Sequence, residues 1–121
     1  VTEIEPSGQW VNEKQLPGGS NFFTGPHHLP SDTLEKRYGS DAERFRRHCL
    51  QLGGKALDFG DCSFTFEALP RIPLACVLYA ADEEFPARIT FLFDSTIQYQ
   101  LPMEIILSLG HCFAVKLEQL P

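Results

Sequence analysis

Three apolar runs separated by short turns constrain the fold of this chain more than any other feature. In CSFTFEAL, residues 62–69, every second residue is apolar, which is the pattern of a β-strand with one buried face. PLACVLYA, residues 73–80, is apolar throughout and predicts the most central strand, and ARITFLFD, residues 87–94, alternates again. We expect these strands to pair as an antiparallel meander. A further segment, KALDF at residues 55–59, is expected to form a tight hairpin with the strand at 62–69.

Two helices are predicted before these strands and one after them. Residues 31–39, SDTLEKRYG, begin with a serine suited to capping a helix and end with a glycine that stops it. In residues 40–54, Ser40 and Glu43 have the spacing of a capping box, in which each side chain satisfies a free backbone amide. The fold class is therefore α+β: an antiparallel β-meander of three to four strands with two to three helices packed on one face.

The last predicted helix, residues 101–120, contains a glycine near its middle. Gly110 costs about 1 kcal/mol relative to alanine inside a helix, so we expect either that another element packs closely against it or that the helix is broken there. Residues 1–30 are rich in proline and glycine. They are expected to form loops, apart from a short edge strand at Trp10 and Val11.

Length, charge and cysteine content limit the classes of function. The 121 residues suffice for a single domain, 1–121, and the formal charge of −6 disfavours binding to a nucleic-acid backbone. The four cysteines show no Cys-x-x-Cys spacing and lie within apolar patterns, which is typical of free thiols in a reducing cytoplasm. No leader of charged and then apolar residues opens the chain, and no apolar run is long enough to span a bilayer, so we expect a cytoplasmic protein without membrane contact.

The segment LPGGSNFFTGPHHLP, residues 16–30, is the first candidate site. Prolines on both sides of its histidine pair restrict the backbone and would hold the His27 imidazole in place, as a ligand or proton-transfer site needs. Phe22 and Phe23 would supply an apolar wall. The alternative is that the phenylalanines plug the sheet while the histidines bond to backbone groups of their own loop.

The acidic loop AADEEFP, residues 80–86, is the second candidate. It places Asp82, Glu83 and Glu84 between the two strongest predicted strands. Neighbouring carboxylates can bind a hard cation, or one of them can act as a general acid when the others raise its pKa. The alternative is a solvated hairpin tip, whose charges discourage pairing at the sheet edge.

Several short motifs resemble, in sequence order, those of a known prokaryotic family. They are Gly8-x-Trp10-Val11, Leu16-Pro17-Gly18-Gly19, Gly25-Pro26-His27, Leu69-Pro70-Arg71-Ile72-Pro73, Asp82-Glu83-Glu84-Phe85-Pro86-Ala87 and Leu92-Phe93-Asp94. On these motifs the chain is similar to the domain-of-unknown-function family thirty-seven eighty-six. Tyr79 departs from the pattern, since the strand before the acidic loop tends to end in tryptophan. Family members also tend to begin earlier, with an extra helix and strand, which implies a domain lacking an N-terminal portion.

The resemblance implies a soluble protein of anaerobic bacteria and archaea, sometimes joined to or encoded beside iron–sulfur, corrinoid or one-carbon enzymes. The leading hypothesis is a cytoplasmic binding or accessory domain for that metabolism, with a corrinoid or iron–sulfur protein as partner. We expect one site between residues 16–30 and 81–86. Its ligand-binding candidates are His27, Asp82, Glu83, Glu84, Phe22, Phe23 and Phe85, of which His27, Asp82 and Glu84 are the candidate metal ligands.

Two other classes of function stay open. A divalent metal held by His27 and the carboxylates at 82–84, with an open position for water, would make the domain a hydrolase or lyase. In the third hypothesis, the proline-containing loops and exposed phenylalanines form the seam of a homodimer.

Overall fold

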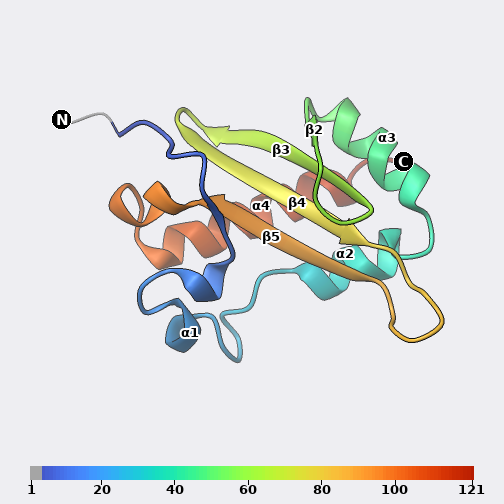
Figure 1. Cartoon of the computed structure of the whole chain (residues 1–121), viewed down its shortest axis with the longest axis horizontal. Helices are drawn as coiled ribbons and strands as arrows, with labels where there is room; N and C mark the ends of the chain where they lie inside the picture. The colour runs from blue at the N-terminus through green and yellow to red at the C-terminus, as the bar shows by residue number, and fades with distance from the viewer. Residues whose placement is uncertain (1–3) are drawn as a thin grey trace.

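A computed structural model describes residues 4–121, which contain one antiparallel sheet with helices behind it (Figure 1). The strands are β1 (Trp10–Val11), β2 (Lys55–Leu57), β3 (Cys62–Leu69), β4 (Ile72–Tyr79) and β5 (Arg88–Asp94). The helices are α1 (Gly19–Phe22), α2 (Ser31–Tyr38), α3 (Ala42–Gln51) and α4 (Met103–Glu118), with the 3-10 helices η1 (Glu13–Gln15) and η2 (Ser95–Tyr99). Within residues 4–121, no helix has the length and apolar character needed to cross a membrane.

The strand order β1-β5-β4-β3-β2 confirms the α+β class and the meander from β2 to β5. The sheet has five strands rather than the predicted three to four, because both the Trp10–Val11 strand and the short β2 pair with longer neighbours. β4 is central, as its uninterrupted apolar sequence predicts for a strand buried on both faces.

The inner face of the sheet and three helices enclose the core. Phe64, Cys76 and Phe91 lie directly opposite one another on β3, β4 and β5, and all three are buried. Figure 1 shows α4 crossing behind the strands, with α2 alongside β5. The helices complete the cluster with Leu34 from α2, Phe45 from α3 and several apolar residues from α4. Every second strand residue therefore packs against the helices, as the alternation predicts.

Three helix boundaries differ from the prediction. Ser31 does not cap α2, because it is the first residue of the helix and Pro30 stands in the capping position. The capping box predicted at Ser40 and Glu43 is wrong, because α3 is capped by Asp41, whose Oδ1 accepts a hydrogen bond from the Arg44 amide at 3.0 Å. The Glu43 carboxylate instead pairs with Arg46 one turn later. The last helix begins at Met103, with Pro102 in the capping position, so it starts two residues after the predicted boundary.

Gly110 lies inside an unbroken α4. A Cβ atom added to this glycine would lie 2.5 Å from Cδ2 of Leu29, which is closer than atoms of two side chains can approach. The first alternative from the sequence is therefore confirmed: another element, the end of the 16–30 segment, packs closely against the helix. This contact fixes the entry to α2, which starts two residues after Leu29.

Candidate functional site

The 16–30 segment is anchored in the core by its apolar residues. Leu16, Phe23 and Leu29 are each only 3–4% exposed. The half-buried Phe22 ring contacts Phe23 edge-on, and the imidazole of the exposed His27 stacks on Phe22 with a centroid distance of 4.6 Å. Phe23 is thus a core residue. Its side chain is not exposed to form part of a homodimer seam or the wall of a surface site.

The histidines of this segment make local contacts. Nδ1 of His28 lies 2.8 Å from the Gly25 carbonyl oxygen, and the His28 carbonyl lies 3.1 Å from Nε2 of His111 on α4. The contact between His28 and Gly25 agrees with the structural alternative, in which imidazoles bond to the backbone of their own loop, whereas the His27 imidazole stacks on Phe22. The acidic loop is also closed on itself, since Oδ1 of Asp82 accepts hydrogen bonds from the amides of Glu84 and Phe85, both at 2.8 Å.

The structure does not bring the two loops together. The 81–86 loop joins β4 to the start of β5, whereas β1 and the 16–30 segment lie toward the other end of β5 (Figure 1). Within residues 4–121, no group of three or more His, Cys, Asp or Glu side chains could hold a metal ion. A metal site formed by His27, Asp82 and Glu84, and the hydrolase or lyase built on it, therefore gain no support from this geometry.

The acidic loop instead forms one wall of a surface pocket of about 530 Å³ at the end of the sheet. Its charged and aromatic lining residues are Glu35, Asp61, Tyr79, Asp82, Phe85 and Arg88. Phe85 is 67% exposed at this pocket, although aromatic side chains of this size are usually buried. Glu83 and Glu84 are also exposed on the same loop.

Three carboxylates from three different elements are fixed at this pocket by backbone amides. Glu35 of α2 accepts a hydrogen bond from the Ile89 amide, and Asp61 accepts one from the Ala80 amide, both at 2.8 Å. Hydrogen bonds from the Phe85 and Glu84 amides lower the pKa of Asp82. In each carboxylate one oxygen accepts these bonds, and the other accepts none from residues 4–121. Asp82 could be predicted from the sequence, but Glu35 and Asp61 could not, because no local pattern joins positions so far apart in the chain.

Arg88 supplies the one positive charge among the residues that line this pocket. It lies directly opposite Tyr79 in the β4–β5 register, and its guanidinium carbon lies 4.4 Å from the centre of the Tyr79 ring. Such a distance is typical of a cation–π contact, in which the ring face attracts a positive charge. The pocket therefore combines fixed negative charge with two aromatic rings, one of them already covered by a cation.

Asp94, the last residue of the Leu92-Phe93-Asp94 motif, has a structural role. Its carboxylate accepts hydrogen bonds from the backbone amides of Ser7, Gly8 and Thr96 at 2.8–3.0 Å, and from the Ser7 and Thr96 hydroxyls. Burial raises its pKa, but the hydrogen bonds from Thr96, Ser7 and Gly8 outweigh this effect and bring the pKa to about 2. The motif therefore attaches the N-terminal segment to the end of β5, where Trp10 pairs with Asp94.

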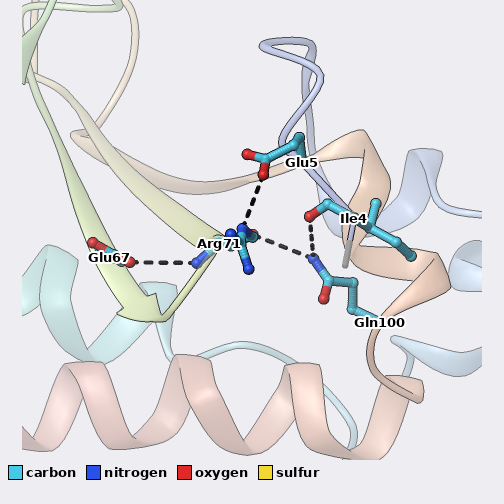
Figure 2. Close-up of polar contacts among 5 residues, drawn as sticks. All are labelled: Ile4, Glu5, Glu67, Arg71 and Gln100. Carbon is cyan, nitrogen blue, oxygen red and sulfur yellow. Dashed lines mark hydrogen bonds and ion pairs between the residues drawn. The ribbon is translucent and has the colours of Figure 1, made fainter. Parts of the chain in front are cut away.

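A second polar network surrounds Arg71 in the turn between β3 and β4 (Figure 2). Its amide donates to Oε1 of Glu67 at 3.3 Å and its Nε donates to Oε1 of Glu5 at 3.1 Å. Nε2 of Gln100 donates to the carbonyls of both Arg71 and Ile4. Arg71 has a φ of 62°, a conformation that is uncommon outside glycine. The Leu69-Pro70-Arg71-Ile72-Pro73 motif thus connects the hairpin, the N-terminal segment and η2.

Two His-Cys dipeptides, His48-Cys49 on α3 and His111-Cys112 on α4, form no joint metal site within residues 4–121. Nδ1 of the buried His48 lies 2.8 Å from the Tyr38 hydroxyl and Nε2 lies 3.0 Å from the Pro121 carbonyl oxygen. Burial lowers the pKa of His48 and raises the pKa of the Cys49 thiol. Both effects favour neutral groups, as is typical of core residues.

These features define an antiparallel α+β domain with an acidic, aromatic-lined pocket at one end of its sheet. The chain belongs to the family described as "Domain of unknown function (DUF3786)", which matches residues 1–116. This confirms the resemblance seen in the sequence motifs. Comparison with curated proteins gives no match, and comparison with solved structures gives none either.

Proposed function

We propose that this domain is a binding module, and that its pocket receives a positively charged segment of a partner protein. The observation that carries the proposal is that Glu35, Asp61 and Asp82 line one pocket beside an exposed Phe85. Backbone amides orient each carboxylate before any ligand arrives, so little side-chain entropy is lost on binding.

The three carboxylates line one pocket but are not grouped closely enough to hold a metal ion, which favours an organic cation as the ligand. A hard metal ion needs several oxygen ligands within about 2.6 Å of one point, and no such cluster is present in residues 4–121. An arginine or lysine side chain is larger, and its donors can reach separate carboxylates while its aliphatic stem contacts an aromatic ring.

A protein segment suits this pocket better than a small amine because the favourable features extend beyond it. Phe85 offers apolar contact area at the surface, and Glu83 and Glu84 continue the negative charge along the same loop. The net charge of −6 would also steer a basic partner toward the domain.

The narrower expectations from the sequence belong to this proposal. They place the domain in the cytoplasm, as an accessory to anaerobic corrinoid, iron–sulfur or one-carbon metabolism, with a corrinoid or iron–sulfur protein as partner. The family resemblance alone supports the metabolic role and the partner, whereas the cytoplasmic expectation rests on the cysteines, which have no Cys-x-x-Cys spacing and lie within apolar patterns. A basic surface on such a protein is the feature that would fit the pocket. Homodimerisation stays a separate prediction.

A labelled hexa-arginine peptide tests the proposal by fluorescence anisotropy. We expect binding that weakens as salt is added, since screening reduces the attraction between exposed charges. The double variant Asp61→Asn/Asp82→Asn keeps the backbone-accepting oxygens and should lower affinity about tenfold, as expected for the loss of two attractive charges. Phe85→Ser should also weaken binding.

The matched control removes the same charge from exposed positions on α4. Glu104→Gln/Glu118→Gln changes the net charge equally, so it should leave the affinity within about twofold if the pocket, and not overall charge, attracts the peptide. Equal weakening in both double variants, or no binding of hexa-arginine at low salt, would show that the pocket is not the site.

A further inference from the structure

Arg88 occupies the aromatic part of the pocket without pairing with its carboxylates. Its guanidinium lies over the Tyr79 ring, at 4.4 Å from the centroid. Within residues 4–121 this guanidinium forms no ion pair, although Glu35, Asp61 and Asp82 line the same pocket. The carboxylates thus keep their unused oxygens, while one of the two aromatic rings already holds a cation.

The position of Arg88 follows from the register of the sheet. It is the first residue of β5 and faces Tyr79, the last residue of β4, across the antiparallel pair. Directly opposed side chains in such a pair have Cβ atoms about 5 Å apart, so a long arginine can fold over its neighbour's ring. Arg88 is exposed and can leave the ring without disrupting the core.

We propose that Arg88 is an intramolecular competitor, which occupies the Tyr79 ring face until the cationic side chain of a bound partner segment replaces it. This inference rests on the proposed function, because it assigns the regulation and specificity of the same pocket. Arg88 weakens binding in two ways: it covers the ring, and its positive charge repels a basic segment. Binding then requires Arg88 to swing away, which selects for partners whose cation and apolar stem replace both interactions at once.

The two ways in which Arg88 weakens binding are separable by mutation. Arg88→Gln removes the positive charge and uncovers the ring. It should tighten hexa-arginine binding about threefold to fivefold, as expected when a peptide arginine forms one cation–π interaction with the exposed ring. In a Tyr79→Leu background the ring is absent, so Arg88→Gln should tighten binding by less than about twofold. Lys116→Gln on α4 removes the same charge at a distance and should leave the affinity unchanged.

The experiment is anisotropy with labelled hexa-arginine on the wild type, Arg88→Gln, Tyr79→Leu, Tyr79→Leu/Arg88→Gln and Lys116→Gln, each checked for folding by circular dichroism. Tighter binding in Arg88→Gln that disappears without Tyr79 supports the competitor. If the wild type binds but Arg88→Gln binds equally or more weakly, Arg88 is not a competitor and the proposed function stands. Tightening of about threefold or more in the Tyr79→Leu background would come from charge repulsion alone and would overturn the competition for the ring. Absence of binding in every protein overturns the proposed function and this inference together.

Discussion

The 16–30 segment and the 80–86 loop both contain proline and phenylalanine, but they place their apolar residues in opposite environments. In the first, Phe23 and Leu29 are 3–4% exposed, and Leu29 packs on the backbone of α4 at Gly110. In the second, Phe85 is 67% exposed, and hydrogen bonds to Asp82 hold the loop closed. A loop that contains proline and phenylalanine can therefore bury its ring or leave it exposed, and the difference lies in what anchors the loop. Apolar anchors bury the Phe23 and Leu29 side chains, whereas the polar anchor of the acidic loop leaves the Phe85 ring exposed.

The largest expected effect compares truncations in these two loops. Leu29→Ala should reduce the free energy of unfolding by about 3 kcal/mol, because it removes buried methyl groups and leaves a cavity beside Gly110. Phe85→Ala removes a larger side chain but should cost less than about 0.5 kcal/mol, because the ring is mostly in water. Urea unfolding followed by circular dichroism measures both values.

Leu50→Ala is the control, because it makes the same leucine-to-alanine truncation at a more exposed position. Leu50 lies on α3 and is 47% exposed, so the same truncation at this position should cost much less than at Leu29. Comparable losses for Leu29→Ala and Phe85→Ala would mean that the two loops contribute equally to the core and that the comparison fails.

The sheet could be predicted from the sequence because its information is local. The alternation in 62–69 and 87–94 and the apolar run in 73–80 each specify which faces are buried, and short turns leave few alternatives for pairing. The packing of Gly110 could be stated only as one of two alternatives, since its partner Leu29 lies in a distant loop. Family motifs drew attention to His27 and Asp82 equally, but a motif does not distinguish a structural role from a binding role.

The pocket could be predicted only in part, for a geometric reason. Asp82 and Phe85 are neighbours in an obvious acidic loop, whereas Glu35 reaches the pocket from α2 and Asp61 from the β2–β3 connection. Glu35 follows Leu34 on a helix and has the appearance of an ordinary solvent-facing residue. Only the antiparallel packing of α2 beside β5 places its carboxylate at the Ile89 amide.

The second prediction compares Asp94, the buried aspartate, with Asp82, the exposed one. The pKa of Asp94 falls from an ordinary 3.8 to about 2. A lowered pKa adds stability at pH values above the unfolded-state pKa, and this stability is lost as the pH falls through the folded-state value. Between about pH 4 and pH 2 the domain should therefore lose about 2 kcal/mol through Asp94.

Urea unfolding at a series of acidic pH values tests this prediction, with Asp94→Asn and Asp82→Asn beside the wild type. Asp94→Asn should be less stable at neutral pH and should show a clearly flatter decline below pH 4, because the titrating group is gone. Asp82→Asn should flatten the decline less than Asp94→Asn, because the pKa of Asp82 is also lowered but its carboxylate is exposed and its hydrogen bonds are screened by water. An unchanged decline in Asp94→Asn would assign the acid sensitivity to other carboxylates and would equate the two aspartates.

The smallest effect concerns a third connection, the turn at Pro70 and Arg71, where backbone conformation and side-chain contacts act in opposite directions. Arg71 has a φ of 62°, so a side chain at this position is strained, yet that side chain binds Glu5 and ties down the N-terminal segment. Arg71→Ala keeps the strain and loses the contacts, whereas Arg71→Gly loses the same contacts and relieves the strain. Arg71→Gly should therefore be more stable than Arg71→Ala by about 1 kcal/mol, the reverse of the order found in helices.

Gly53→Ala supplies the matched reverse change. Gly53 has a φ of 88° and nothing within 4 Å of an added Cβ, so the substitution introduces strain without a collision and should cost about 1 kcal/mol. Urea unfolding of the three variants compares the two sites directly. If Arg71→Ala equals Arg71→Gly while Gly53→Ala is destabilised, the turn relaxes once the arginine is removed. The positive φ of Arg71 would then be imposed by the contacts of its side chain and not by the hairpin. The turn, like the 16–30 segment with Leu29 packed on Gly110, would owe its conformation to side-chain contacts with distant residues.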